Sequence, residues 1–286
     1  MAQEFEVSPL KGSTFAARMD GLDLSLDLDG RDVARIVESF YKYQVLFVPG
    51  QGHIRPADQI KFTRIFGHLE THVQTDFLLD GHPEIFVLSN IVENGRPIGA
   101  VDCALTWHSD SSYIAVPSMA SVLHGVENPP EGATTSFASM YQPYEALSGD
   151  LRRAIEGKRA IHDYLRLQQF QFPDRPLTEE QKRKTPPVAH PIAPRHPVTG
   201  RRSLFLGGAV IAGVEGMPEH EGLALMDDLR AFATQPQFVY EHRWSDGDIV
   251  MWDNRCTLHR GSRYDVERFR RRMHRTTVAG QAAPEF

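Results

Sequence analysis

Trp107-His108-Ser109-Asp110, near the middle of the chain, and residues 252–260, Trp-Asp-Asn-Arg-Cys-Thr-Leu-His-Arg, decide the fold. His108 and Asp110 are two positions apart, so a β-strand would direct both side chains to one face. His259 follows 151 residues after His108 (259 − 108), so only a fold that pairs distant strands could bring the three together. Two imidazoles and one carboxylate are the ligand set of a redox-active iron with open coordination positions. The two stretches therefore predict a metal centre in a β-rich core.

The bulk composition is that of a globular protein. The chain has 286 residues, 41% hydrophobic and 24% charged, and without a linker or internal repeat it is expected to form one domain, 1–286. Its net charge of −6 gives no overall field that favours nucleic acid or an anionic membrane. No run approaches the roughly 20 apolar residues of a membrane-spanning helix, and the acidic N-terminus does not resemble a signal peptide.

The cysteine content indicates the compartment. Cys103 and Cys256 are the two cysteines of the chain, too few for a disulfide framework, so we expect a cytoplasmic protein in which both are small buried residues.

Apolar periodicity predicts a mixture of helices and short strands. The expected helices cover residues 31–43, 56–66, 141–161 and 218–234. The expected strands cover residues 44–50, 85–90, 119–126, 133–138 and the segment around His108, together with a hairpin of 238–244 and 249–252. Residues 163–189 lack periodicity, which is typical of a lid or binding loop. The pattern favours an α+β fold with a barrel-like core.

An arginine-rich segment follows His259. A nucleic-acid contact is disfavoured because few aromatic residues lie between the arginines and the protein is acidic overall. On a strand, Arg271 and Arg275 would share one face. Two inward-facing guanidinium groups are costly unless each pairs with an anion. Since guanidinium binds carboxylates in a bidentate manner, the pair indicates two small acidic molecules near one metal.

Three blocks together resemble the iron(II)/2-oxoglutarate dioxygenases of the TauD/TfdA family: residues 45–51, 107–113 and 251–261. The resemblance covers nearly the whole chain. It implies a double-stranded β-helix, or jelly-roll, core with flanking helices. It also implies that His108, Asp110 and His259 hold Fe(II), and that Thr135 binds the distal carboxylate of the co-substrate 2-oxoglutarate.

The arginine that would bind the same carboxylate has two candidates. The family's usual spacing from the distal histidine points to Arg270, whereas alignment on residues 273–277 points to Arg271. We prefer Arg271 because strand register sets which face a side chain occupies, while a loop tolerates an insertion. The resemblance further implies that Arg275 holds the acidic group of the substrate, with His72 and Asn90 as additional substrate-binding residues.

The expected function is an Fe(II)/2-oxoglutarate-dependent dioxygenase that consumes O2 and releases succinate and CO2. It would hydroxylate, or through hydroxylation cleave, a small carboxylate such as an aryloxyalkanoate. The alternatives are an alkylsulfonate (taurine-type) dioxygenase, a metal- or ligand-binding protein without turnover, and a zinc hydrolase, since two histidines and an acid also suit zinc. The substrate and its stereochemistry, the outcome of hydroxylation and any homo-oligomer stay open.

Overall fold

The computed structural model describes residues 2–72, 74–101, 104–171, 174 and 176–286. Its largest sheet is mixed and has eight strands, running β1 (Glu6–Pro9), β2 (Ala16–Asp20), β3 (Val45–Val48), β14 (Ile249–Asp253), β8 (Ala120–Glu127), β16 (Arg272–Val278), β5 (His82–Ser89) and β4 (Leu78–Leu79). Only β2 and β3 pair in parallel; the other neighbours are antiparallel.

Three smaller sheets complete the strand structure. A second sheet orders β13 (Val239–His242), β9 (Thr135–Ser139) and β15 (Thr257–Gly261), and a third orders β11 (Val188–Pro191), β10 (Arg159–His162) and β12 (Ile211–Val214). A short ribbon pairs β6 (Val92–Glu93) with β7 (Arg96–Pro97).

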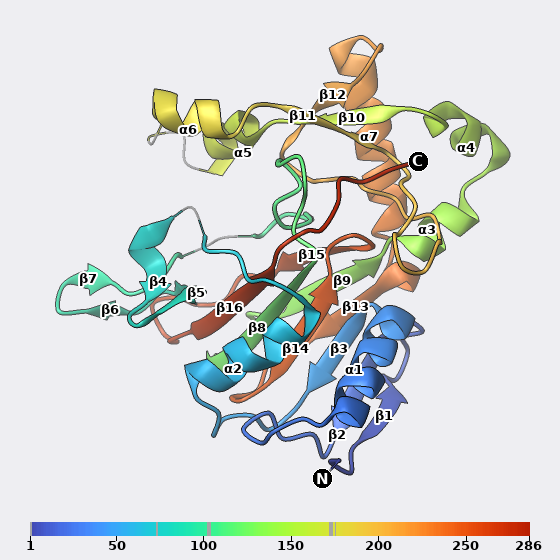
Figure 1. Cartoon of the computed structure of the whole chain (residues 1–286). Helices are drawn as coiled ribbons and strands as arrows, with labels where there is room; N and C mark the ends of the chain where they lie inside the picture. Colours follow the sequence, from blue (N-terminus) through green and yellow to red (C-terminus); the bar gives the residue numbers. More distant parts are fainter. Residues whose placement is uncertain (1, 73, 102–103, 172–173, 175) are drawn as a thin grey trace.

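Some of the helices pack against a sheet and others, within the described residues, do not. They are α1 (Gly30–Tyr43), α2 (Pro56–Thr63), α3 (Tyr141–Ala146), α4 (Gly149–Ile155), α5 (Tyr164–Gln171), α6 (Glu179–Lys184) and α7 (Glu219–Ala233), with 3-10 turns at Arg64–Phe66, Thr75–Phe77 and Pro236–Phe238. Helices α1 and α2 lie against the large sheet, whereas α7 packs on β12 (Figure 1). No helix within the described residues is long and apolar enough to cross a membrane.

Strand alternation divides the core into layers. Along β14, Ile249 and Met251 face α1 and α2, whereas Val250 and Trp252 face the second sheet. Phe137 of β9 meets them from that sheet, and its neighbour Ala138 faces outward to the layer of β10, β12 and α7. The period-2 alternation thus builds an apolar layer between the two central sheets.

Most of the sequence predictions for elements are confirmed. The helices expected at 31–43 and 218–234 are α1 and α7, and the strands expected at 44–50, 85–90, 119–126 and 133–138 are β3, β5, β8 and β9. The helix expected at 56–66 is α2 followed by a 3-10 turn, and Cys256 is buried; Cys103 lies outside the described residues.

The backbone conformation around residues 147–148 divides one predicted helix. The helix expected at 141–161 is α3, α4 and then strand β10, because Leu147 is extended (ψ 138°) and Ser148 caps a new helix by accepting from the Leu151 amide. The segment 163–189, expected to be a lid or binding loop, contains α5, α6 and the start of β11 in its described residues.

The hairpin predicted for 238–244 and 249–252 is wrong. β13 pairs with β9, whereas β14 pairs with β3 and β8, so the two strands belong to different sheets. The turn between them crosses from one sheet to the other: Asp248 accepts hydrogen bonds from the Ser245 amide and from His242. Gly247 has φ 84°, and a Cβ there would meet the backbone of Gly52 at 2.3 Å.

We predict that His162 makes the fold sensitive to acid. Its ring is buried between Phe205 and His190, and neither ring nitrogen has a hydrogen-bond partner in the described chain. Burial, followed by the neighbouring His190, lowers the pKa of His162 to about 3, from an ordinary value of 6.5. Between pH 6.5 and 3 the His162 side chain is therefore protonated in the unfolded chain but neutral in the folded one. The free energy of unfolding that this group contributes above pH 6.5 is lost as the pH falls toward 3.

Urea unfolding at a series of pH values would test this prediction. His162→Leu removes the titrating ring with little change in volume and should reduce the dependence of the unfolding free energy on pH by up to about 1.4 kcal/mol per pH unit. The control is His220→Gln, at an exposed side chain. An unchanged slope in His162→Leu would contradict the assignment.

Candidate metal centre

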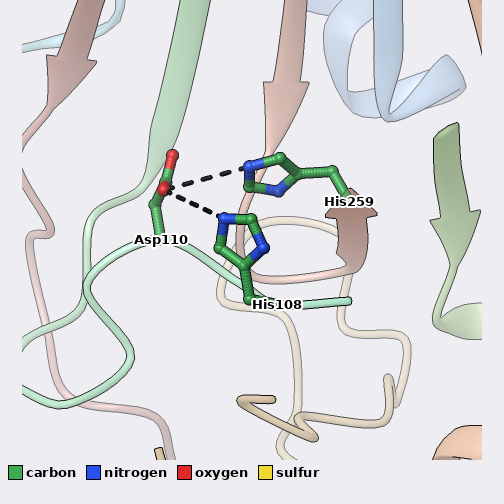
Figure 2. Close-up of side chains that lie close together, drawn as sticks. All are labelled: His108, Asp110 and His259. Atoms are coloured by element: carbon green, nitrogen blue, oxygen red, sulfur yellow. Dashed lines mark ion pairs between the residues drawn. The ribbon is translucent and has the colours of Figure 1, made fainter. Parts of the chain in front are cut away.

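His108 and His259 are brought together by a single antiparallel bridge. The amide of each donates to the carbonyl of the other, at 3.0 and 2.9 Å. The prediction that His108 and Asp110 share a regular strand is wrong: the extended backbone is limited to this bridge, and the chain turns at Asp110. Even so, Asp110 Oδ1 lies 3.8 Å from His108 Nε2 and 3.9 Å from His259 Nε2 (Figure 2).

A hydrogen bond sets the tautomer of His108, and both imidazoles are neutral. His108 Nδ1 lies 2.8 Å from the Thr106 carbonyl, which only accepts, so Nδ1 carries the hydrogen and the Nε2 lone pair faces Asp110. Burial is the main cause that lowers the pKa of His108, and burial followed by His108 lowers that of His259. Both rings are therefore neutral near pH 7.

Asp110 is a buried carboxylate that stays ionised. Burial alone would raise its pKa, but the charge of Arg275 and the hydrogen bond from Ser121 hold the pKa well below the ordinary value. Arg275 Nη1 lies 3.2 Å from Oδ1, and the Ser121 hydroxyl donates to Oδ2 at 2.6 Å. The ligand atoms of His108, Asp110 and His259 all lie within 4.8 Å of one another, so one ion could contact all three.

Asn254 positions Ser121, the hydroxyl donor to Asp110. Its amide nitrogen donates to Ser121 Oγ at 3.0 Å, and its oxygen accepts from Trp252 Nε1 at 2.9 Å. Ser109 Oγ in turn donates to the Asn254 carbonyl at 2.5 Å. The sequence alone did not point to Ser121 and Asn254, although Asn254 lies in the quoted stretch 252–260.

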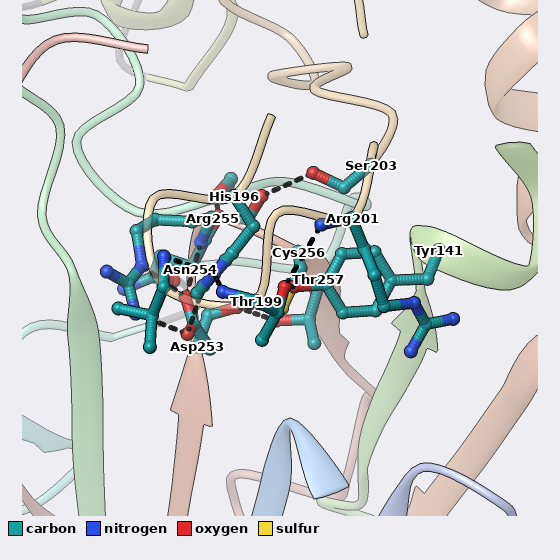
Figure 3. A network of polar contacts seen from close by, with 12 residues as sticks. Tyr141, His196, Thr199, Arg201, Ser203, Asp253, Asn254, Arg255, Cys256 and Thr257 are labelled. Carbon is teal, nitrogen blue, oxygen red and sulfur yellow. Dashed lines mark hydrogen bonds and ion pairs between the residues drawn. The ribbon is translucent and has the colours of Figure 1, made fainter. Parts of the chain in front are cut away.

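A buried polar network holds the turn that carries Asn254 (Figure 3). Arg255 binds both oxygens of Asp253, at 2.8 and 2.6 Å, and His196 Nε2 contacts the same carboxylate at 3.0 Å. Cys256 completes a second group of metal-type donors with His196 and Asp253. Because burial raises the pKa of the Cys256 thiol and Arg255 already neutralises Asp253, this network is a structural ion cluster.

A cavity opens beside the metal-type donors. Its lining includes His108, Asp110, Arg275, His72, Phe86, Leu88, Tyr113, Tyr164, Leu167 and Val210. Tyr164 and Leu167 belong to α5, and the Tyr164 ring centroid lies 4.4 Å from that of Tyr113. Apart from Arg275 and the metal-binding group, most of these side chains are apolar or aromatic, so the cavity suits a ligand with an apolar body.

His72 adds a hydrogen-bond donor to this cavity. Its Nδ1 accepts from the Gln74 amide at 3.1 Å, so Nε2 carries the hydrogen. Burial, followed by the charge of Arg275, lowers the pKa of His72 to about 3. Arg275 contributes a cation whose Nε has no partner among the described residues. The neutral donor His72 and the cation Arg275, both expected from the sequence to bind substrate, therefore line one cavity.

Arg270 and Arg271 have opposite environments. Arg270 is exposed and pairs with Glu127 at 2.9 Å. Arg271 is half-buried with its Nε enclosed, and within the part of the chain that the structure describes no carboxylate forms an ion pair with it. Its guanidinium carbon lies 5.9 Å from the Tyr264 ring, and burial lowers its pKa. Arg271 is not among the residues that line the cavity above.

Thr135 and Asn90 complete the predicted residues. Thr135 is buried, and its hydroxyl oxygen accepts from Trp244 Nε1 at 2.9 Å, which leaves its own hydrogen free to donate. The expected contact of Asn90 with the substrate stays a prediction; in the structure its side-chain amide bonds to the backbone of Val266, Phe269 and Arg271.

Comparison with known proteins gives a consistent result. The model of the "Taurine catabolism dioxygenase TauD, TfdA family" matches residues 6–277. The alpha-ketoglutarate-dependent 2,4-dichlorophenoxyacetate dioxygenase of Cupriavidus pinatubonensis is 38% identical over 278 residues, which cover 94% of this chain and 96% of that protein. Pentalenolactone F synthase of Streptomyces arenae is 32% identical over 288 residues, 96% of this chain and 95% of that protein.

A solved structure agrees over the full length. AAD-2, crystallised with Mn(II) and N-oxalylglycine, superposes with a TM-score of 0.83 at 32% identity and covers 98% of this chain and 99% of its own. The chain belongs to the TauD/TfdA family of dioxygenases.

Proposed function

We propose that the protein is an Fe(II)/2-oxoglutarate-dependent dioxygenase that hydroxylates a small carboxylate with an apolar body, such as an aryloxyalkanoate. The observation that carries the proposal is the half-buried Arg271, whose enclosed Nε has no hydrogen-bond partner and which forms no ion pair with a carboxylate in the described chain. Such a group is costly unless an anion binds it. Arg271 lies four residues from Arg275, about 13 Å along an extended chain, so two anions could bind side by side.

The donor set suits ferrous iron. His108, Asp110 and His259 offer two neutral nitrogens and one carboxylate oxygen within 4.8 Å of one another, which is the ligand set of non-heme iron oxygenases. When bound, the iron supplies the coupling of 2-oxoglutarate decarboxylation by O2 to substrate hydroxylation, with succinate and CO2 released. The residues around it keep Asp110 ionised and both histidines neutral.

Arg271 and Thr135 are proposed to bind the distal carboxylate of 2-oxoglutarate. Arg271 offers the charge and Thr135 a hydroxyl hydrogen, which the bond from Trp244 to the hydroxyl oxygen leaves available. Both residues lie beside the segment 262–264. The Arg271 guanidinium lies over the Tyr264 ring, and the Ser262 amide donates to the carbonyl of Thr134, the residue before Thr135.

The substrate is proposed to bind in the cavity between β5, β16 and α5. Its acidic group would meet Arg275 and the Nε2–H of His72, while Phe86, Tyr113 and the α5 side chains would contact its apolar body. Helix α5 would then act as the lid expected from the segment 163–189. An alkylsulfonate is the second candidate, because the same donor and cation suit a sulfonate.

Three further features belong to the proposal. The facing sheets support a double-stranded β-helix core, and the contacts that link the layers support a single domain over 1–286. The buried free thiol of Cys256 supports a working place in the reducing cytoplasm.

The first test concerns the metal. His108→Ala should lose bound Fe(II), measured by metal analysis after anaerobic loading, and lower succinate formation by more than about 100-fold, since a direct ligand matters more than an outer one. His53→Ala, at a half-exposed histidine, is the control. Retained succinate formation in His108→Ala would refute the assignment, and a zinc-loaded protein active without 2-oxoglutarate would favour a hydrolase.

The second test separates the two adjacent arginines. Arg271→Gln should raise the KM for 2-oxoglutarate about tenfold or more, because a charge-assisted hydrogen bond in a buried site contributes about 1.5–3 kcal/mol. Arg270→Gln removes an exposed ion pair and should change KM less than twofold. The reverse order of effects would assign the role to Arg270.

The third test concerns the substrate class. Succinate formation should have a kcat/KM at least roughly tenfold higher with phenoxyacetates than with taurine, because burial of an aromatic ring contributes about 1.5–3 kcal/mol that a two-carbon chain lacks. Preference for taurine would establish the second candidate. No stimulation of O2 uptake by any acid in the panel would favour a binding protein without turnover.

A further inference from the structure

We propose that Ser89 and Asn90 form a clamp that positions Arg271 and thereby sets the affinity for the distal carboxylate of 2-oxoglutarate. This inference rests on the proposed function, since it concerns the residue assigned there to the co-substrate. Ser89 and Asn90 bond to the backbone of Arg271 and are not among the residues that line the cavity, so we assign both as positioning residues.

The two side chains bind both backbone polar groups of Arg271. Asn90 Oδ1 accepts from the Arg271 amide at 2.8 Å, and Ser89 Oγ donates to the Arg271 carbonyl at 2.7 Å. Arg271 directly precedes β16, whose first residue, Arg272, is the Cα partner of Ser89. The end of β5 is therefore bonded to Arg271 through the side chains of Ser89 and Asn90, and not through the backbone hydrogen bonds of the sheet.

The donors of Asn90 hold the loop that leads to Arg271. Its amide nitrogen donates to the carbonyls of Val266 and Phe269, both at 2.9 Å. Residues 262–271 contain no helix or strand, so few regular backbone bonds keep them in place. One side chain thus fixes three points of this loop, and the last of them is the residue that faces inward.

The clamp is needed because three arginines are consecutive. Arg270 pairs with Glu127 and Arg272 with Glu93, whereas Arg271 forms no ion pair within the described residues and lies over the Tyr264 ring. A slip of one residue would exchange the inward and outward side chains, because successive residues of extended chain point to opposite faces. Such a slip would be favourable for Arg271 alone, since a desolvated guanidinium gains water at the surface. The bonds to its amide and carbonyl oppose this exchange.

Binding of two 2-oxo acids would test the clamp. Calorimetry on the Mn(II)-loaded protein would compare 2-oxoglutarate with pyruvate, which lacks the distal carboxylate. Asn90→Ala should weaken 2-oxoglutarate binding about tenfold and leave pyruvate binding within twofold. Ser89→Ala and Asn90→Asp, which keeps the acceptor for the Arg271 amide, should each give a smaller loss. The kcat at saturating 2-oxoglutarate should stay within about threefold of the wild type.

A double variant identifies the route of the effect. If Asn90 acts through Arg271, Asn90→Ala should add little to the loss already caused by Arg271→Gln. Asn128→Ala is a matched control, because this asparagine also donates to a backbone carbonyl but at the Ser245 turn; it should leave both affinities unchanged.

The outcomes separate the clamp from the proposed function. Equal losses for both acids in Asn90→Ala, or full additivity with Arg271→Gln, would mean that Asn90 only stabilises the fold and would overturn the clamp. A loss in Arg271→Gln without one in Asn90→Ala or Ser89→Ala would overturn the clamp alone. Equal wild-type affinities for the two acids would instead overturn the assignment of Arg271, and the clamp with it.

Discussion

The ionised carboxylate of Asp110 is the group on which the centre of the molecule depends. A buried charge is stable only when opposite charge and hydrogen-bond donors surround it. Arg275 of β16 supplies the charge, Ser121 of β8 supplies the donor, and Asn254 after β14 holds Ser121 in place. Three neighbouring strands of the large sheet thus contribute to one carboxylate, while His259 of the second sheet faces it from across the core.

The position of Asp110 also depends on polar contacts farther from it. The turn after β14 is closed by the ion cluster of Asp253, Arg255 and His196, and this turn also carries Asn254. His196 comes from the connection between β11 and β12. A loop far from β14 in the sequence therefore supports the position of Asp110 without contacting it.

Much of the fold could be predicted from local pattern. Helices α1 and α7 and strands β3, β5, β8 and β9 follow from apolar periodicity, because each element buries one face. The failures share a physical cause: pairing is not local. The segments 238–244 and 249–252 look like a hairpin, yet their strands join different sheets, since the turn at Gly247 packs against the backbone of Gly52. Likewise, His108 was expected on a regular strand, whereas a single bridge to the distant His259 holds its backbone in place.

The sequence by itself determined the residue types of the site: two histidines, one aspartate and a run of arginines at spacings that indicate a metal and two anions. Tertiary structure decided which of the consecutive arginines faces inward, because burial of Arg271 and exposure of Arg270 depend on the register of β16 against β5. It also brought the Asn90 side chain to the backbone of Arg271. Such assignments require knowing which strands lie side by side, and a hydrogen bond between residues 181 positions apart leaves no local trace in a sequence.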